Sequence, residues 1–156
     1  MTDSERATAA YRAVTQFMDE AQLQYERRDD EREAFVTITG ADFPVTLLFT
    51  VNESAQRVET YSRLPFAPKK EKAVDLAAAV AAVNNRIAYG KFCVYFDKGI
   101  CTFENSEYIT DLEGFGTEYG RAIVAPAYSI IDEYNEKLYA LNRGLLTVKE
   151  FTAALR

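Results

Sequence analysis

The sequence predicts an α+β fold: a helix, three antiparallel strands, a second helix, a β-hairpin, a long kinked helix and a short C-terminal helix. Three observations support this fold class. Apolar residues recur at helical spacing near the start of the chain and again in its second half, and apolar and polar residues alternate between residues 34 and 64. Most specific is the turn Asp97-Lys98-Gly99 between two alternating segments, because Gly99 can adopt the positive φ of a short hairpin turn.

The first helix has Ser4 as a suitable N-cap and an apolar stripe that runs from Ala7 to Tyr25. The run Glu26–Glu33 carries charges of both signs and predicts a solvated helix end and loop. The third of the strands that follow has few apolar residues on its core face, which favours an edge or partly exposed position. The three strands are expected within Ala34–Thr39, Pro44–Val51 and Arg57–Leu64.

The second helix, between Ala73 and Ile87, is rich in alanine. Small side chains allow close packing, either within the chain or at a subunit interface. The hairpin then comprises Lys91 to Phe96 and Ile100 to Glu104. The residues expected to face the core from this hairpin are Phe92, Val94, Phe96, Cys101 and Phe103.

The two cysteines, Cys93 and Cys101, both lie in this hairpin. A two-residue turn places them on opposite faces of the sheet, and a three-residue turn places them diagonally on one face. Neither arrangement suits a disulfide, so both thiols are expected to be reduced.

A long helix is expected from about Thr117 to Leu141. Pro126 removes the backbone hydrogen bond to Ala122 and predicts a kink or a break. Thr147 and Glu150 have the spacing of a capping box, which predicts the short C-terminal helix.

The length and net charge of the chain limit the classes of partner that it can bind. The chain has 156 residues, enough for a single domain with its own core, and a net charge of −6. An acidic surface repels phosphates, so nucleic acid and membrane surfaces are unfavourable partners. The N-terminal residues are polar and no segment is apolar enough to cross a membrane, which favours the cytoplasm.

The sequence offers no catalytic, metal or cofactor site. It contains no histidine, which excludes a Ser–His or Cys–His pair and a Cys/His metal site. The connection Gly114-Phe115-Gly116 lacks the third glycine or lysine of a phosphate-binding loop. The carboxylates of Asp111, Glu113, Asp132, Glu133 and Glu136 fit a solvated acidic surface better than a catalytic pair.

One face of the hairpin is the candidate binding surface. If the core side is as expected, the opposite face is apolar and needs a cover, which is either the chain's own helices, a second subunit or a partner chain. Its residues are Cys93, Tyr95, Ile100 and Thr102.

The segment from Ala73 to Phe103 resembles bacterial YbjN-like sequences. The alanine-rich helix ends at Val83-Asn84-Asn85-Arg86, and Tyr89-Gly90-Lys91-Phe92 begins the hairpin, similar to the family's helix-end asparagine and "gkf" passage. The order of elements also resembles class I chaperones of type III secretion, which share one α/β sandwich topology. The resemblance implies one domain over residues 1–156, with residues 144–156 as a C-terminal helical extension and Asn84 closing its helix.

The resemblance further implies a non-enzymatic, cytoplasmic interaction or regulatory domain, expected as a homodimer, that binds a protein partner on an exposed sheet face or edge. A chaperone for a secreted effector is the alternative. A small enzyme that uses carboxylate and tyrosine chemistry is the third hypothesis.

Overall fold

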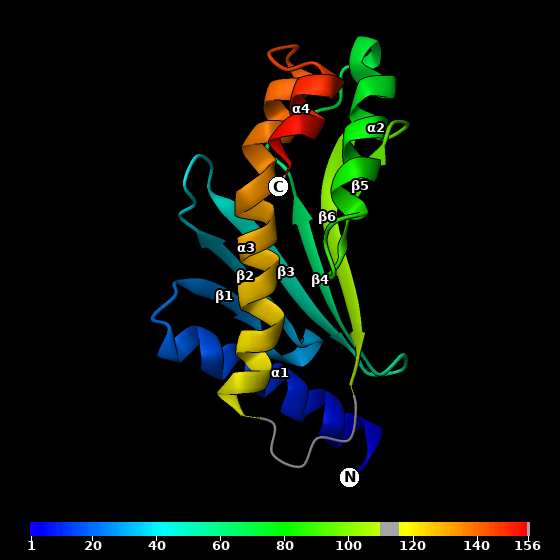
Figure 1. Cartoon of the computed structure of the whole chain (residues 1–156). Helices are drawn as coiled ribbons and strands as arrows, with labels where there is room; N and C mark the ends of the chain where they lie inside the picture. The colour runs from blue at the N-terminus through cyan, green and yellow to red at the C-terminus, as the bar shows by residue number, and fades with distance from the viewer. Residues whose placement is uncertain (110–115, 156) are drawn as a thin grey trace.

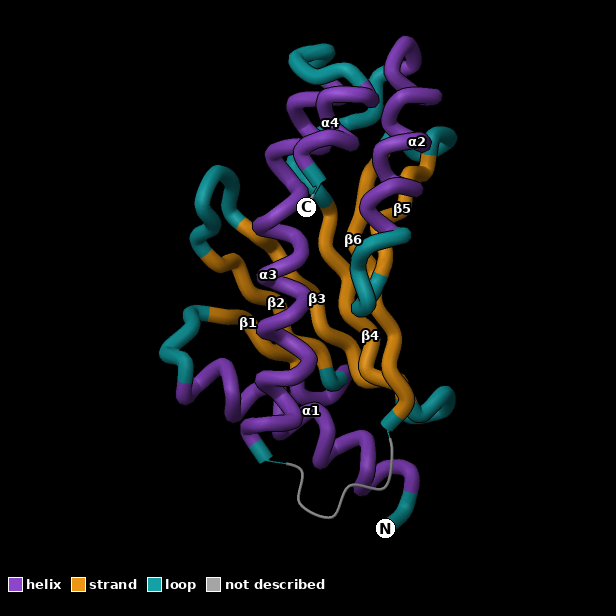
Figure 2. The backbone as a smooth tube through the Cα atoms, in the orientation of Figure 1, coloured by secondary structure: helices purple, strands orange, loops and turns teal. Residues whose placement is uncertain are grey.

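A six-stranded antiparallel sheet with helices packed on one face forms the computed structural model, which describes residues 1–109 and 116–155 (Figures 1 and 2). The strand order is β1-β2-β3-β4-β6-β5. The strands are β1 (Tyr25–Arg28), β2 (Glu33–Ile38), β3 (Val45–Asn52), β4 (Arg57–Arg63), β5 (Lys91–Tyr95) and β6 (Ile100–Tyr108). The helices are α1 (Asp3–Glu20), α2 (Ala73–Asn84), α3 (Thr117–Asn142) and α4 (Val148–Ala154).

The predicted fold class is confirmed, with one more strand than expected before α2. The prediction of a solvated loop over the charge run is wrong at its start, because Tyr25–Arg28 form edge strand β1. Tyr25 donates its hydroxyl to Asp19 of α1 at 2.8 Å. Arg27 lies over the ring of Tyr11 and donates to Asp29 at 2.7 Å. The contacts of Tyr25 with Asp19 and of Arg27 with Tyr11 therefore hold this strand against α1.

The strand pattern shows which face is covered. In β3, buried Val45, Leu47, Phe49 and Val51 alternate with half-buried residues. In Figure 1, α2 and α3 lie in front of the sheet, on the side of these buried residues. Of the two positions expected for β4, the edge position is wrong, since β4 pairs with both β3 and β6. The partly exposed position is confirmed, because Tyr61 and Arg63 are exposed. The thin core face of β4 includes Thr60 and Ser62, which are buried in the middle of the sheet.

The helices α1 and α3 cross in close contact. A Cβ atom on Gly120 of α3 would lie 2.2 Å from the carbonyl oxygen of Ala13 in α1. The N-cap of α1 is Thr2 and not Ser4, because Thr2 forms a reciprocal capping box with Glu5. The crossing fixes α1 across the lower end of the sheet (Figure 1).

Pro126 lies inside a single C-terminal helix. Of the kink or break expected at this proline, the break does not occur, because α3 continues through Pro126, and the kink stays a prediction. The capping box of Thr147 and Glu150 at the start of α4 is confirmed. Phe151 of α4 is fully buried, so this short helix completes the core beside α2 and α3.

The hairpin is confirmed, with Gly99 at a φ of +66°. Its turn contains four residues, since Tyr95 pairs with Ile100, and the carbonyl of Tyr95 accepts from Gly99 at 2.9 Å. Phe96 therefore lies in the turn, 49% exposed, and the expectation that it faces the core is wrong. Cys93 and Cys101 are free and lie on opposite faces of the sheet.

Candidate protein-binding surface

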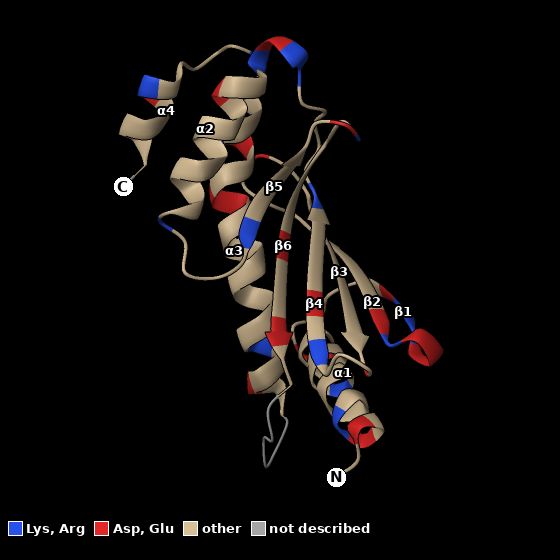
Figure 3. Cartoon of the chain, turned by 90° about the vertical axis from the view of Figure 1, so that its right-hand side faces the viewer, with Lys and Arg blue, Asp and Glu red and all other residues tan. Residues whose placement is uncertain are grey.

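The face of the sheet that points away from α2 and α3 is the most extensive candidate site. Figure 3 shows the molecule from the side of β5 and β6, with these helices on one side of the sheet. We call the opposite side the open face. Large side chains remain accessible there, among them Phe35 at 43% and Tyr61 at 37% exposure.

A continuous apolar row crosses this open face. The register aligns Phe35 of β2 with Leu48 of β3, and Leu48 with Tyr61 of β4. Directly opposed residues on one face of an antiparallel sheet are in side-chain contact. We call Phe35, Leu48 and Tyr61 the open-face stripe. It ends at Glu26 of β1 on one side and at Glu104 of β6 on the other.

Charges of both signs surround the open-face stripe, and they balance. The basic residues are Arg28, Arg57, Arg63 and Lys91, and the acidic ones are Glu26, Glu33, Glu59 and Glu104. Figure 3 shows the alternation of basic and acidic positions along β4. Because the whole chain carries −6, the open face repels an approaching protein less than the average surface does.

The four residues predicted to bind a partner lie together on this open face. Cys93 pairs with Thr102, and Tyr95 pairs with Ile100. Tyr95 and Thr102 both donate hydroxyl hydrogens to the carboxylate of Glu104, at 2.6 and 2.8 Å. Thr102 is fully buried, so these polar groups bind one another instead of facing outward.

This hydrogen bonding controls the charge of Glu104. Burial opposes ionisation of its carboxyl, but the bonds from Tyr95 and Thr102, together with Cys93 and the charge of Lys91, outweigh burial and hold the pKa of Glu104 below its ordinary value. Burial, followed by the nearby Glu104, raises the pKa of the Cys93 thiol. A thiol with a raised pKa is a poor nucleophile.

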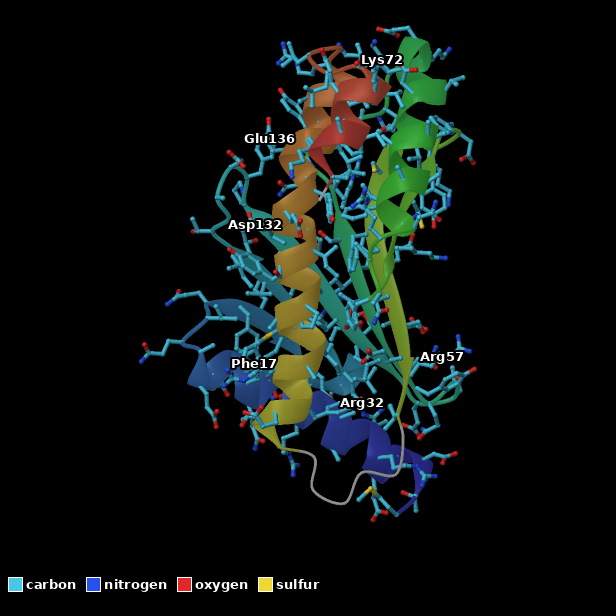
Figure 4. The ribbon with its side chains drawn as sticks, in the orientation of Figure 1. Phe17, Arg32, Arg57, Lys72, Asp132 and Glu136 are labelled. Atoms are coloured by element: carbon cyan, nitrogen blue, oxygen red, sulfur yellow. The ribbon has the colours of Figure 1, made fainter. Side chains whose placement is uncertain are left out.

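A shallow hollow of about 650 Å³ lies beside this cluster, where β5 ends against the longer β6. Its wall includes Arg57, Tyr61, Lys91, Glu104 and Ser106. Arg57 donates to the hydroxyl of Tyr108 and lies over that ring, near the end of β6 (Figure 4). The hollow joins the open-face stripe to the edge of the sheet.

The remaining acidic candidates do not converge on a site. Asp111 and Glu113 lie outside the described residues. Asp132 of α3 accepts a hydrogen bond from the backbone of Ala41 at 2.8 Å and so anchors the β2–β3 connection (Figure 4). Within residues 1–109 and 116–155, no three His, Cys, Asp or Glu side chains are grouped to hold a metal ion.

None of the helices in the described part of the chain is long and apolar enough to cross a membrane.

Sequence reasoning located the hairpin corner of the open face but missed the open-face stripe. The alternation in β2, β3 and β4 carried the signal, since Phe35, Leu48 and Tyr61 each occupy a position opposite to the buried residues. Joining them into one row required the strand register.

Comparison with known proteins relates this fold to one family. Residues 11–114 match the family model YbjN, described as "Putative bacterial sensory transduction regulator". The chain is also similar to the crystal structure of YbjN from E. coli, "a putative transcription regulator", with 14% sequence identity and a TM-score of 0.58 over 86% of this chain and 92% of that one. No curated protein matches the sequence.

Proposed function

The chain belongs to the YbjN family, and from this membership we propose that it is a non-enzymatic regulatory domain that binds a protein partner on the open face of its sheet. The observation that carries the proposal is the open-face stripe. Aromatic residues are enriched at protein–protein interfaces, which have a polar rim, and exposed apolar patches on a domain mark binding surfaces.

The edges of the sheet support the choice of the face over β1 and β5. The outer edge of β5 is occupied at Phe92, whose backbone N–H and C=O both bond to the side chain of Asn84. Edge strand β1 is charged at Glu26, Arg27 and Arg28, which disfavours the addition of another strand. Addition of a partner strand is therefore disfavoured at both of these edges, which favours the open face.

A second copy of the chain is the alternative occupant of the open face. The balanced charges permit two identical faces to approach. A two-fold axis parallel to the strands, between β3 and β4, would bring Glu26 of β1 opposite Lys91 of β5, the strand beyond Glu104. We propose homodimer formation on this ground, with the monomer as the form that binds a different partner.

The test compares variants of the open face with a variant on the helical side. Phe35→Arg and Tyr61→Arg place a charge in the stripe, and Val74→Arg places one on α2 at a residue that is 83% exposed. Light scattering over a dilution series measures self-association, and crosslinking followed by mass spectrometry identifies other partners.

We expect the stripe variants to lose the dimer or the crosslinked partner and Val74→Arg to keep it. Circular dichroism spectra that match the unsubstituted protein establish that the variants are folded. If association persists in both stripe variants, the open face is not the binding surface.

A further inference from the structure

Part of the backbone edge of β6, next to the hollow, is not paired with any strand among the described residues. In the ladder between β4 and β6, Leu64 donates to the carbonyl of Cys101 at 2.9 Å and Ile109 donates to Gln56 at 2.8 Å. Backbone groups of an antiparallel strand point to alternate sides, so alternate residues between Cys101 and Ile109 also bond to β4. The backbone groups of Ser106 and Tyr108 therefore point away from β4.

Beyond the end of β5, this side of β6 has no neighbouring strand in the described part of the chain. β5 reaches only as far as the pair Lys91 with Glu104. Ser106 and Tyr108 are both exposed, and Ser106 lines the hollow. Figure 3, viewed from this side, shows β6 extending well past the end of β5. An unpaired strand edge of this kind is a template for an added strand.

The side chain between these two residues indicates the chemistry of the added strand. Glu107 points to the helical side of the sheet and is half-buried. Burial raises its pKa, although Asn105 beside it opposes the shift. Among the described residues, no Lys or Arg comes within ion-pair distance of Glu107. A partly buried carboxylate of this kind gains most from a basic residue brought against it.

We propose that an extended segment of the partner protein adds as a strand to the edge of β6 at Ser106 and Tyr108, with a Lys or Arg beside Glu107. This inference rests on the proposed function and identifies the strand edge, in β6, to which the partner binds. The added strand continues the line of β5 and runs antiparallel to β6. Its alternate side chains lie in the hollow and against Glu107, because side chains of a strand alternate between faces.

The first test uses a synthetic fluorescein-labelled peptide with the repeating sequence Lys-Thr-Lys-Thr-Lys-Thr as the probe and Glu-Thr-Glu-Thr-Glu-Thr as its matched control. Fluorescence anisotropy on the full chain measures binding. We expect the lysine peptide to bind about tenfold more tightly than the glutamate peptide, and the Glu107→Lys variant to reverse this preference. An equal affinity of the unsubstituted protein and Glu107→Lys for both peptides overturns the assignment of the basic residue.

A second test reports on the backbone and requires no substitution in the protein. Amide hydrogen exchange by NMR should be fast at Ser106 and Tyr108 in the free protein and about tenfold slower with saturating lysine peptide. N-methylation of alternate residues in the peptide removes donors from one of its two edges at a time. Only one of the two methylated peptides should lose binding. Loss in both or in neither, or slow exchange in the free protein, contradicts strand addition.

The Phe35→Arg variant separates the two proposals. If the partner is lost from Phe35→Arg but the peptide fails to protect Ser106, the partner binds the open face and the inference about β6 is wrong. If partner binding survives Phe35→Arg and Tyr61→Arg, the proposed function fails whatever the peptide does.

Discussion

At the scale of single residues, Asn84 replaces a neighbouring strand. Its side-chain oxygen accepts from the N–H of Phe92 at 2.8 Å, and its side-chain nitrogen donates to the carbonyl of Phe92 at 2.9 Å. These are the two bonds that an adjoining strand would supply to that residue. One amide at the end of α2 therefore joins the helix to edge strand β5.

Removal of this amide should destabilise the protein. Asn84→Ala leaves two half-buried backbone groups of Phe92 unbonded, at a cost of about 2 kcal/mol. Urea unfolding followed by circular dichroism measures the change. Asn85→Ala, at an exposed neighbouring position, is the control and should change the free energy of unfolding by less than about 0.5 kcal/mol. Equal effects of the two substitutions would show that the hydrogen bonds between Asn84 and Phe92 contribute nothing to the free energy of unfolding.

The hydroxyl of Tyr95 should set the ionisation of Glu104. Because the folded pKa of Glu104 is lowered, its contribution to stability is present above the ordinary glutamate pKa of about 4.3 and is lost as the pH falls through the folded value. In Tyr95→Phe the carboxyl loses one donor, so its pKa should rise and the acid sensitivity of folding should decrease. An NMR titration of the Glu104 carboxyl measures this, with Tyr108→Phe as control.

Residue roles were predictable from the sequence where the local backbone determines them. The alternation of the hairpin was enough to place Tyr95 and Ile100 on the face opposite Phe92. It failed at Phe96, because alternation does not specify where a strand ends and its turn begins. Asn84 was expected to close a helix, and its bonds to Phe92 depend on a contact between two elements that no local pattern encodes.

At the scale of elements, the charge run after α1 shows how tertiary contacts override composition. Charged residues disfavour a strand in isolation. In β1 the alternate side chains, Tyr25 and Arg27, reach α1, and those between them reach solvent. Burial and the hydrogen bond to Asp29, the residue after β1, raise the pKa of Tyr11 to about 12. The phenol of Tyr11 therefore stays protonated and donates to Asp29. The residues that stabilise β1 lie in α1 and β2, outside the charge run itself, so the composition of the run does not reveal them.

The crossing of α1 and α3 depends on the absence of a side chain at Gly120. Replacing a helical glycine by alanine ordinarily stabilises a helix by about 1 kcal/mol. Here the new methyl group would meet the backbone of Ala13 and the Cβ of Phe17 at 2.8 Å, so Gly120→Ala should destabilise by about 1–3 kcal/mol or more. Thermal unfolding measures the effect.

The control for this prediction is Gly116→Ala at the N-cap of α3, where a Cβ would meet no atom of the described residues within 4 Å. It should cost no more than about 1 kcal/mol. A stabilised Gly120→Ala variant would mean that the two helices are not held at this separation.

At the scale of the whole molecule, the order of the strands decides what the open face contains. Each strand of the stripe was recognisable in the sequence, and its outward residues could be named. The sequence did not reveal that β4 lies between β3 and β6, since that placement requires pairing across α2 and the hairpin. The open-face stripe and the edge of β6 that is unpaired among the described residues both follow from this order.

The C-terminal helix should be part of the same folding unit as the sheet. Phe151 lies beyond the residues that match the family model, yet it is fully buried in the core cluster that contains residues of α1 and β3. Phe151→Ala should lower the free energy of unfolding by about 3–5 kcal/mol. Tyrosine fluorescence and far-ultraviolet circular dichroism should report one coincident transition. Two transitions would establish that residues 144–156 fold separately from the remainder.

The close crossing of α1 and α3 also bears on how the chain folds during synthesis. α1 begins at Asp3, whereas α3 begins at Thr117, on the far side of the entire sheet in sequence. A ribosome adds about 5–20 residues per second, so several seconds pass between the synthesis of α1 and that of α3. Over this interval the apolar side of α1 has no contact with α3. During that time the growing chain depends on molecular chaperones, or on the early strands alone, to keep α1 from aggregating.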